Sequence, residues 1–313
     1  MKADPGTVLS LPSPTAQIID RTGLALVAGS ALVWSFGGAI ARTISVEDTW
    51  TVVFWRSIFA ALFLLGFMIV RDGPRGAVAL FRGMGWPGVA VGACFAVASI
   101  SFVMAIGYTT VANVILVGAA VPLVAALIGW LVFRNAVSRG TWVAIAAVIG
   151  GVAIMVVGSS GDGGSLIGNL LALLMTVAFA LATVITRQYA SVRMTPAVCT
   201  GMVLAATVAG VNAGAFAVGA LDLGLLFAFG ALNLGLGVSL FVTGARLLPA
   251  ALTGLIGTAE TVLGPLWVWI FHAEVPAART FAGGGVVLLA LVVHIAMELR
   301  KAAPQQSPAV RST

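Results

Sequence analysis

The sequence predicts an all-α membrane protein with ten transmembrane helices, arranged as two inverted five-helix repeats, with both termini in the cytoplasm. Three observations lead to this prediction. Hydrophobic residues make up 60% of the chain and charged residues only 8%, whereas a soluble domain carries roughly 25% charged residues. Long apolar runs recur along the chain, and the basic residues between them are distributed asymmetrically. The two halves also share a weak sequence similarity.

Ten apolar segments have the length that a transmembrane helix requires, which is about 20 residues. The chain contains 38 glycines, and glycine is favoured where membrane helices pack closely. The connections between segments are short and leave no room for a second domain. The expected helices span residues 22–42, 51–70, 86–107, 111–133, 140–158, 166–186, 195–219, 224–245, 250–271 and 280–298.

The basic residues predict the orientation, because cytoplasmic loops of membrane proteins are enriched in Lys and Arg. With the N-terminus in the cytoplasm, thirteen of the sixteen Lys and Arg fall on the cytoplasmic side. Only Arg42 and Arg279 fall outside, and Arg56 lies within a helix. A miscounted helix would invert every later loop, so the distribution favours an even number of crossings. The tails 1–21 and 299–313 are then cytoplasmic, and the Arg-rich, Lys-poor composition points to a bacterial inner membrane.

The two halves align with each other. Residues 102–122 align without a gap with residues 241–261, and at a nearby offset Trp34 meets Phe179. The unit is therefore five helices, and because five is odd the second copy must enter the membrane from the opposite side. Inverted repeats of this kind are typical of secondary transporters, whose substrate site lies between the repeats near the midplane of the bilayer. The expected repeats are residues 22–158 and 166–298.

Several short motifs lie on or next to the expected helices: Leu32-Val33-Trp34-Ser35 on the first, Phe54-Trp55-Arg56 on the second, Val121-Pro122 and Glu260-Thr261 on the fourth and ninth, and Ala273-Glu274 after the ninth. With them, residues 22–298 resemble the drug/metabolite transporter superfamily, in particular its ten-helix EamA-type members. The sequence departs from the family pattern where Thr261 replaces the proline that often follows the glutamate, and where Asn135 replaces the closing glutamate of the first half. The resemblance implies a transporter of small metabolites, commonly an exporter, and not an enzyme.

Glu260 is the sharpest candidate for a functional residue. It lies about ten residues into the ninth expected helix, where a charge is costly and normally faces a cavity or a partner. Gly257, Gly264 and Trp267 share its helix face, and two glycines would leave room for a substrate group or water. Because burial favours the uncharged form of a carboxyl group, Glu260 is a candidate for proton coupling. It could equally bind a cationic amine, or be a structural residue paired within the bundle.

Arg56 is the second charge inside an apolar run, in the outer third of the second expected helix. Three interpretations stay open for its side chain. It could pair with Glu260, extend outward to the interface as long basic side chains do, or bind a substrate carboxylate.

Trp34, Phe179, Asn233 and Trp267 complete the predicted substrate site. Trp34 lies in mid-helix with small residues one turn away on either side, so its ring could stack on a substrate, and Phe179 is its counterpart in the second half. The side-chain amide of Asn233 must find a hydrogen-bond partner in the membrane, either in the substrate or in a neighbouring helix. Ordinary packing is the alternative for the aromatic residues.

The sequence predicts no cofactor and no metal site, because His272 and His294 have no second ligand at a suitable spacing. It contains no nucleotide-binding loop, and its basic residues are too scattered for a nucleic-acid interface. The expected partners are a small-molecule substrate, the lipid bilayer and a proton as coupling ion. Gly88-x-x-x-Gly92 and Gly210-x-x-x-Gly214 would serve dimerisation or packing within the bundle, so a monomer and a homodimer both remain open.

The leading functional hypothesis is a secondary transporter that exports amino acids or amphiphilic amines by alternating access around a midplane cavity. A facilitative, channel-like uniporter is the main alternative. An intramembrane lipid-modifying enzyme is a further alternative, although the short loops hold no cluster of His and Asp residues.

Overall fold

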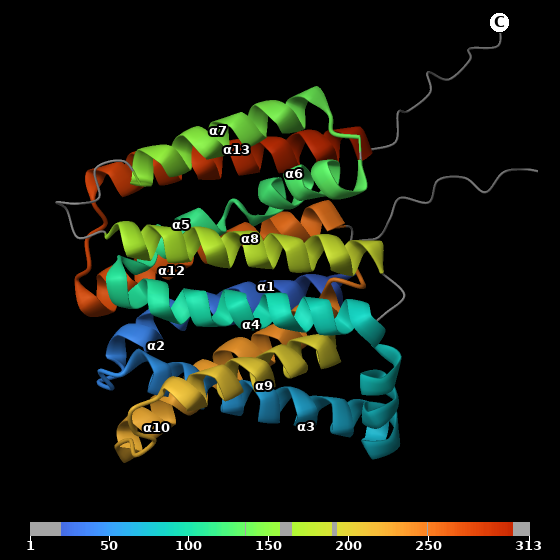
Figure 1. Cartoon of the computed structure of the whole chain (residues 1–313). Coiled ribbons are helices and arrows are strands. Elements are labelled where there is room, and N and C mark those ends of the chain that lie inside the picture. The colour runs from blue at the N-terminus through green and yellow to red at the C-terminus, as the bar shows by residue number, and fades with distance from the viewer. Residues whose placement is uncertain (1–19, 135, 157–164, 190–192, 249, 303–313) are drawn as a thin grey trace, which may run out of the picture.

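The structure, a computed structural model, describes residues 20–134, 136–156, 165–189, 193–248 and 250–302, and this part of the chain consists of helices and short connections without a β-strand. Its helices run side by side along one axis of the molecule (Figure 1). The elements are α1 Arg21–Ser35, α2 Gly37–Thr43, α3 Thr49–Gly83, α4 Gly85–Tyr108, α5 Val111–Gly118, α6 Val121–Phe133, α7 Arg139–Val156, α8 Leu166–Gln188, α9 Thr195–Asn212, α10 Ala220–Phe227, the π-helix η1 Ala228–Leu236, α11 Gly237–Gly244, α12 Ala250–His272 and α13 Ala278–Ala302.

Eight of the described helical segments are long and apolar enough to cross a membrane, and the pair α5 and α6, bent by 41°, would make a ninth. The remaining apolar helix, α7, is shorter. Each of the ten expected segments therefore coincides with a helix or a bent pair, although the last residues of 140–158 lie outside the described part. A multi-pass helical membrane protein is confirmed, while the number of ten crossings stays a prediction.

The expected helix 195–219 is wrong at its C-terminal end, because α9 ends at Asn212 and α10 begins at Ala220. The segment between them is held by the start of α3 instead of by its own helical hydrogen bonds. The Asp48 carboxylate accepts from the Gly214 N–H at 2.9 Å, and the Thr51 hydroxyl donates to the Ala215 carbonyl at 2.6 Å. These long-range bonds satisfy backbone groups that a longer helix would have paired internally.

The segment after residue 70, expected to be a cytoplasmic loop, is helical. Gly73 has φ 75° and ψ 166°, a conformation that glycine adopts at little cost. Pro74 follows, and proline suits the first position of a helix. Together they end the membrane-spanning part of α3 and start a short helical segment that continues to Gly83.

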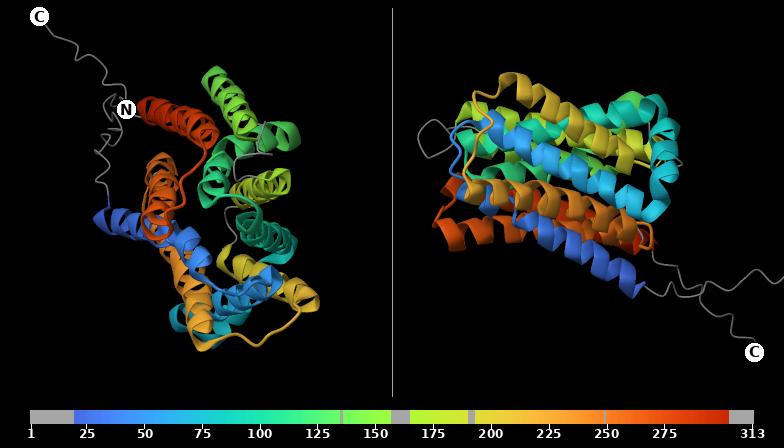
Figure 2. Two further views of the ribbon diagram at one scale, coloured as in Figure 1. Left: turned by 90° about the vertical axis from the view of Figure 1, so that its left-hand side faces the viewer. Right: turned by 90° about the horizontal axis from the view of Figure 1, so that it is seen from below.

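The helices form two rows, which are seen from one end in the left view of Figure 2. The first row contains α13, α12, α1 with α2, and α11 with η1; the second contains α7, α6 with α5, α8, α4 and α9. The rows meet at one edge where α13 packs on α7, and at the other where α3 packs on both η1 and α9. Between the rows, α5 packs against α12 and α13, and α2 packs against α4.

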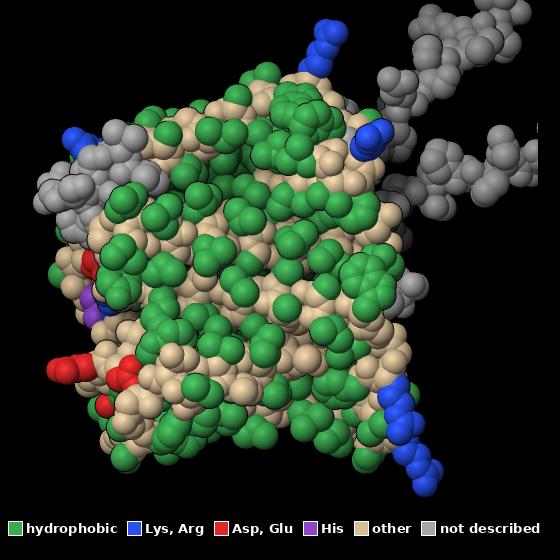
Figure 3. All heavy atoms as spheres, in the orientation of Figure 1, with side chains coloured by type: hydrophobic (Ala, Val, Ile, Leu, Met, Phe, Trp, Pro, Cys, Tyr) green, Lys and Arg blue, Asp and Glu red, His purple; other side chains and the backbone are tan. Residues whose placement is uncertain are grey.

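Apolar side chains cover the visible outer face of the bundle, whereas charged side chains gather at its ends (Figure 3). We call the end with Glu47, Asp48, Asp222 and Glu274 the acidic end. The opposite, basic end carries Arg71, Arg75, Arg82, Arg134, Arg139, Arg187, Arg193 and Arg246. An apolar belt between two charged ends is the surface that a bilayer requires. The N-terminal end of α1 and the C-terminal end of α13 both lie at the basic end (Figure 1).

The glycine spacing at Gly88 and Gly92 serves packing inside the bundle. A Cβ atom at Gly92 would lie 2.8 Å from the carbonyl oxygen of Ala197 and 3.3 Å from the nitrogen of Gly201. Glycine at this position therefore lets α4 and α9 approach each other closely. The second motif ends at Gly214, beyond the end of α9.

Candidate functional site

The first helix is broken beside Trp34. α1 ends at Ser35 and α2 begins at Gly37, which leaves two carbonyls near the break without their usual helical donors. The side-chain amide of Asn233 donates to the carbonyl oxygens of Val33 at 2.6 Å and Trp34 at 3.2 Å. The sequence left open whether the Asn233 amide bonds to a substrate or to a neighbouring helix, and in the structure it bonds to the neighbouring helix α1.

Asn233 reaches the break from η1, a π-helix, and such elements occur frequently at functional sites. Glycines in this region let other helices come close. A Cβ at Gly230 would overlap the Arg56 carbonyl oxygen, and one at Gly237 would overlap the Trp34 indole. The Trp34 ring, half-buried, also lies 5.4 Å from the Phe241 ring, centroid to centroid. Trp34 is therefore packed between α1 and the η1–α11 segment.

Trp267 of α12 binds the same break from the other side. Its indole N–H donates to the Ser35 hydroxyl at 2.9 Å. Its ring stacks on Phe36, with centroids 4.7 Å apart and planes inclined by 11°. Trp34, Asn233 and Trp267 are thus brought together around residues 33–36.

Glu260 lies near the middle of α12, two helical turns before Trp267. Its side chain is half-buried, and no hydrogen bond or ion pair joins it to any side chain in the part of the chain that the structure describes. A Cβ at Gly257 would meet no atom within 4 Å, whereas one at Gly264 would overlap the Ile115 side chain. The sequence predicted open space beside Glu260 at both Gly257 and Gly264, and the structure has it at Gly257 alone.

Arg56 is buried, with 5% of its surface exposed. Its Nη1 donates to the Ser99 hydroxyl at 2.6 Å, and its guanidinium carbon lies 4.3 Å from the Phe229 ring centroid and 5.5 Å from that of Phe102. The ring faces provide a cation–π environment for this charge, while Nε has no hydrogen-bond partner. The guanidinium neither pairs with Glu260 nor extends to the surface.

Phe179 lies on α8, in the second row, with 38% of its surface exposed. Its ring packs edge-to-face on Phe95 of α4, with centroids 5.0 Å apart. Phe95 and Trp34 both pack on the buried cluster around Leu64 and Met202. The structure thus places Phe179 across from Trp34 and not in contact with it, with Phe95 in the intervening layer.

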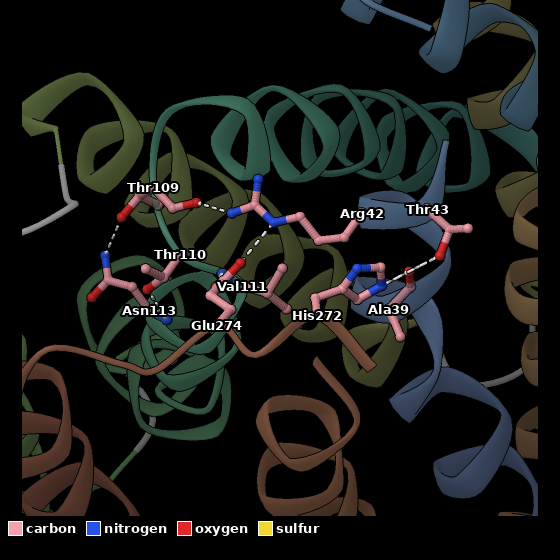
Figure 4. A network of polar contacts seen from close by, with 9 residues as sticks. All are labelled: Ala39, Arg42, Thr43, Thr109, Thr110, Val111, Asn113, His272 and Glu274. Carbon is pink, nitrogen blue, oxygen red and sulfur yellow. Dashed lines mark hydrogen bonds and ion pairs between the residues drawn. The ribbon is translucent and has the colours of Figure 1, made fainter. Parts of the chain in front are cut away.

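A polar network that the sequence prediction did not include lies at the acidic end (Figure 4). The Arg42 Nε and a carboxylate oxygen of Glu274 form an ion pair at 2.8 Å. Arg42 Nη2 also donates to the Thr109 carbonyl at 2.9 Å, and the Val111 N–H donates to the other Glu274 oxygen at 2.7 Å. In the sequence this network is visible only as two isolated charges, Arg42 at the end of the first expected helix and Glu274 after the ninth.

Two further groups extend this network (Figure 4). The His272 Nε2 lies 3.0 Å from the Ala39 carbonyl oxygen and 3.3 Å from the Thr43 hydroxyl. The buried Asn113 amide donates to the Thr109 hydroxyl at 3.2 Å and to the side-chain oxygen of Asn169. The connection between α4 and α5 is thus held on both sides by hydrogen bonds.

The comparisons with known proteins agree with this arrangement. Residues 21–157 match the model of the EamA-like transporter family. The match covers less than half of the chain and shows a similarity to that family. EamA-like proteins are membrane transporters of the drug/metabolite transporter superfamily, so the resemblance read from the motifs is confirmed. A transporter family also fits a protein that is not an enzyme.

The fold extends beyond the part that the family model matches. Sixteen chains of solved structures match this chain. One of them, a crystal structure described only as that of a protein, is 17% identical with a TM-score of 0.61, and the match covers 90% of this chain and 99% of the other. At this identity the likeness shows the fold alone. A search of the curated proteins finds no match.

Proposed function

We propose that the chain is a secondary transporter that exports small metabolites, amino acids or amphiphilic amines, by alternating access around Glu260. The family supports the transport class, and a carboxylate that has no partner among the described side chains, in the middle of a membrane helix, supports the position of the site. The proposed substrate site contains Glu260, Trp34, Trp267 and Asn233 on the first row, and Phe179 on the second row behind Phe95. Arg56, with its orphaned Nε, lies at the edge of this site.

The substrate chemistry follows from the charges at the site. Glu260 has no cationic partner within the described part of the chain, so a substrate ammonium group would supply one. The stacked rings of Trp267 and Phe36 lie two turns further along and would accept an apolar or aromatic group next to that amine. In this proposal Asn233 holds the break in the first helix, so that the stacked rings keep their position.

A proton is the proposed coupling ion. When the ammonium group leaves, Glu260 would stand alone in a low-dielectric environment, where taking up a proton lowers the cost of its charge. Substrate and proton would then occupy the same carboxylate in turn. Exchange of this kind would drive export with the inward proton gradient across a bacterial inner membrane.

The repeat arrangement is part of the proposal. Among the residues that the structure describes, two other than glycine, Arg134 and Ala273, have positive φ, 54° and 51°. They end α6 and α12 and stand 139 positions apart, the same offset at which the two halves of the sequence align. This observation supports the inverted repeat of residues 22–158 and 166–298. The basic ends of the helices are proposed to face the cytoplasm.

The test is transport by the protein reconstituted in liposomes, with a panel of labelled amino acids and amines, with and without a pH gradient. Wild type is compared with Glu260→Gln and with Glu47→Gln, which removes a carboxylate from an exposed loop at the acidic end. We expect gradient-driven accumulation of one solute in wild type and Glu47→Gln, and its loss in Glu260→Gln. Downhill movement of a solute at a rate that depends neither on the pH gradient nor on Glu260→Gln would indicate a uniporter. It would also refute the role of Glu260.

A further inference from the structure

The Arg42–Glu274 pair connects the two rows of helices. Arg42 belongs to α2 and Glu274 to the connection between α12 and α13, so both side chains come from the first row. The groups that they hold, the Thr109 carbonyl and the Val111 N–H, belong to the connection between α4 and α5 in the second row. With the ion pair at 2.8 Å, four groups therefore tie the rows together at the acidic end.

A buried apolar layer lies next to this network and joins the same elements. It contains Ala39, Ala105, Ile106, Val111, Val114, Leu116, Val117, Met155, Ala172 and Val268. Two glycines make the approach possible, because a Cβ at Gly38 would overlap Val111 and a Cβ at Gly264 would overlap Ile115. At the acidic end, α5 is thus pressed against α2 and α12 without intervening space.

Towards the basic end the rows are joined beside α3, where Val238 of α11 shares a buried cluster with Val198 and Met202 of α9, and they are less closely joined elsewhere. Among the described helices, no backbone packing comparable to that of α5 on α12 joins α6 to α12, or α1 to α4 or α8. The ion pairs at that end, Arg193 with Asp72 at 2.7 Å and Arg71 with Asp72 at 3.5 Å, involve only α3 and the start of α9, which are neighbours already. The contrast between the ends indicates a bundle that is closed at the acidic end.

We propose that Arg42 and Glu274 form a latch, which with the apolar layer beneath it closes the acidic end of the transport path to Glu260. Release of the pair frees the Thr109 carbonyl and the Val111 N–H together, so that the connection between α4 and α5 can separate from α2 and α12. The proposal rests on the proposed function, because a latch needs a path to close. The latch proposal identifies the groups that keep the path closed.

Access of water to the path can be measured without knowing the substrate. A cysteine at Gly257, where a Cβ meets no atom within 4 Å, reports access near Glu260 in a chain whose Cys94 and Cys199 are replaced by alanine. A membrane-impermeant thiol reagent is applied to intact cells and to inside-out vesicles. Cysteines at Glu47 and Arg75 establish which end of the bundle each preparation exposes.

In this parent chain we expect labelling of Gly257→Cys from the basic end. Adding Arg42→Gln or Glu274→Gln is expected to raise labelling from the acidic end by about fivefold or more, the size of a typical coupling between two states. Glu47→Gln, which removes a charge at the same end, should leave it unchanged. Strong labelling of the parent from the acidic end, no increase in either latch variant, or an equal increase in Glu47→Gln would overturn the latch.

One further outcome separates the two proposals. If no variant is labelled from either end, water does not reach Gly257, and both the transport path and the proposed function are refuted. Transport that persists while the latch variants show no change in access would overturn the latch alone.

A second variant tests the latch with the Arg42–Glu274 pair left intact. The Cβ of Gly38 would lie 3.4 Å from the Cβ of Val111, close to the separation in a disulfide, which is about 3.5–4.5 Å. In Gly38→Cys with Val111→Cys, made in the chain without Cys94 and Cys199, an added oxidant should cross-link α2 to α5 and stop transport, and a reductant should restore transport. Unimpaired transport by the cross-linked protein would contradict a gate at this position.

Discussion

Removing the Asn233 amide should destabilise the bundle through the break between α1 and α2. In Asn233→Ala, the carbonyls of Val33 and Trp34 lose donors at 2.6 and 3.2 Å. Hydrogen bonds between membrane helices contribute on average ~0.6 kcal/mol and at most ~1.7 kcal/mol. The free energy of unfolding should therefore fall by about 1–3 kcal/mol. Asn233→Asp, which keeps the shape but cannot donate when charged, should cost at least as much.

The assay is reversible unfolding in mixed micelles with increasing SDS, followed by circular dichroism. Ser239→Ala is the matched control, because the Ser239 hydroxyl is equally buried but donates only to Gly235 of its own helical segment, at 2.9 Å. It should lower the free energy of unfolding by less than ~0.5 kcal/mol. If Asn233→Ala and Ser239→Ala are equally stable, the helix break does not depend on this amide and the reasoning is wrong.

Three further predictions concern other sites. Gly38→Ala would force a Cβ into Val111 and should cost ~1–3 kcal/mol in the same unfolding assay, while Gly66→Ala, with no atom within 4 Å, should cost nothing. Ala273→Gly, at φ 51°, should raise the free energy of unfolding by ~1 kcal/mol; a decrease would show that the left-handed conformation carries no strain. Slight burial raises the pKa of Asp48, but hydrogen bonds from a hydroxyl and backbone N–H groups outweigh it and keep the pKa below its ordinary value. The stability that this carboxylate adds is therefore present above about pH 4 and lost as the pH falls further, so the melting temperatures of wild type and Asp48→Asn should converge in acid and differ at pH 7.

The positions of the helices could be predicted because each apolar run has the length of a membrane crossing. The break at Phe36 could not, because residues 22–42 form one predominantly apolar run that contains no proline. The break depends on an amide two hundred residues away in the sequence. The early end of α9 has a similar origin, since Asp48 and Thr51 hold the following residues from a different helix.

The candidate site shows the same division between local and long-range information. A carboxylate within an apolar run is visible in the sequence, so Glu260 could be singled out. Its lack of a described partner, and the burial of Arg56 between aromatic rings, depend on how separate helices pack. The latch could not be predicted because two of its four groups are backbone atoms, which every residue possesses.

That last property has an evolutionary consequence. The backbone carbonyl of residue 109 and the N–H of residue 111 are available whatever side chains stand there, proline at 111 excepted. Substitutions at these two positions should therefore accumulate without loss of the hydrogen bonds. Selection would act on Arg42 and Glu274 as a unit, so that among relatives the two positions should keep opposite charges or lose them together.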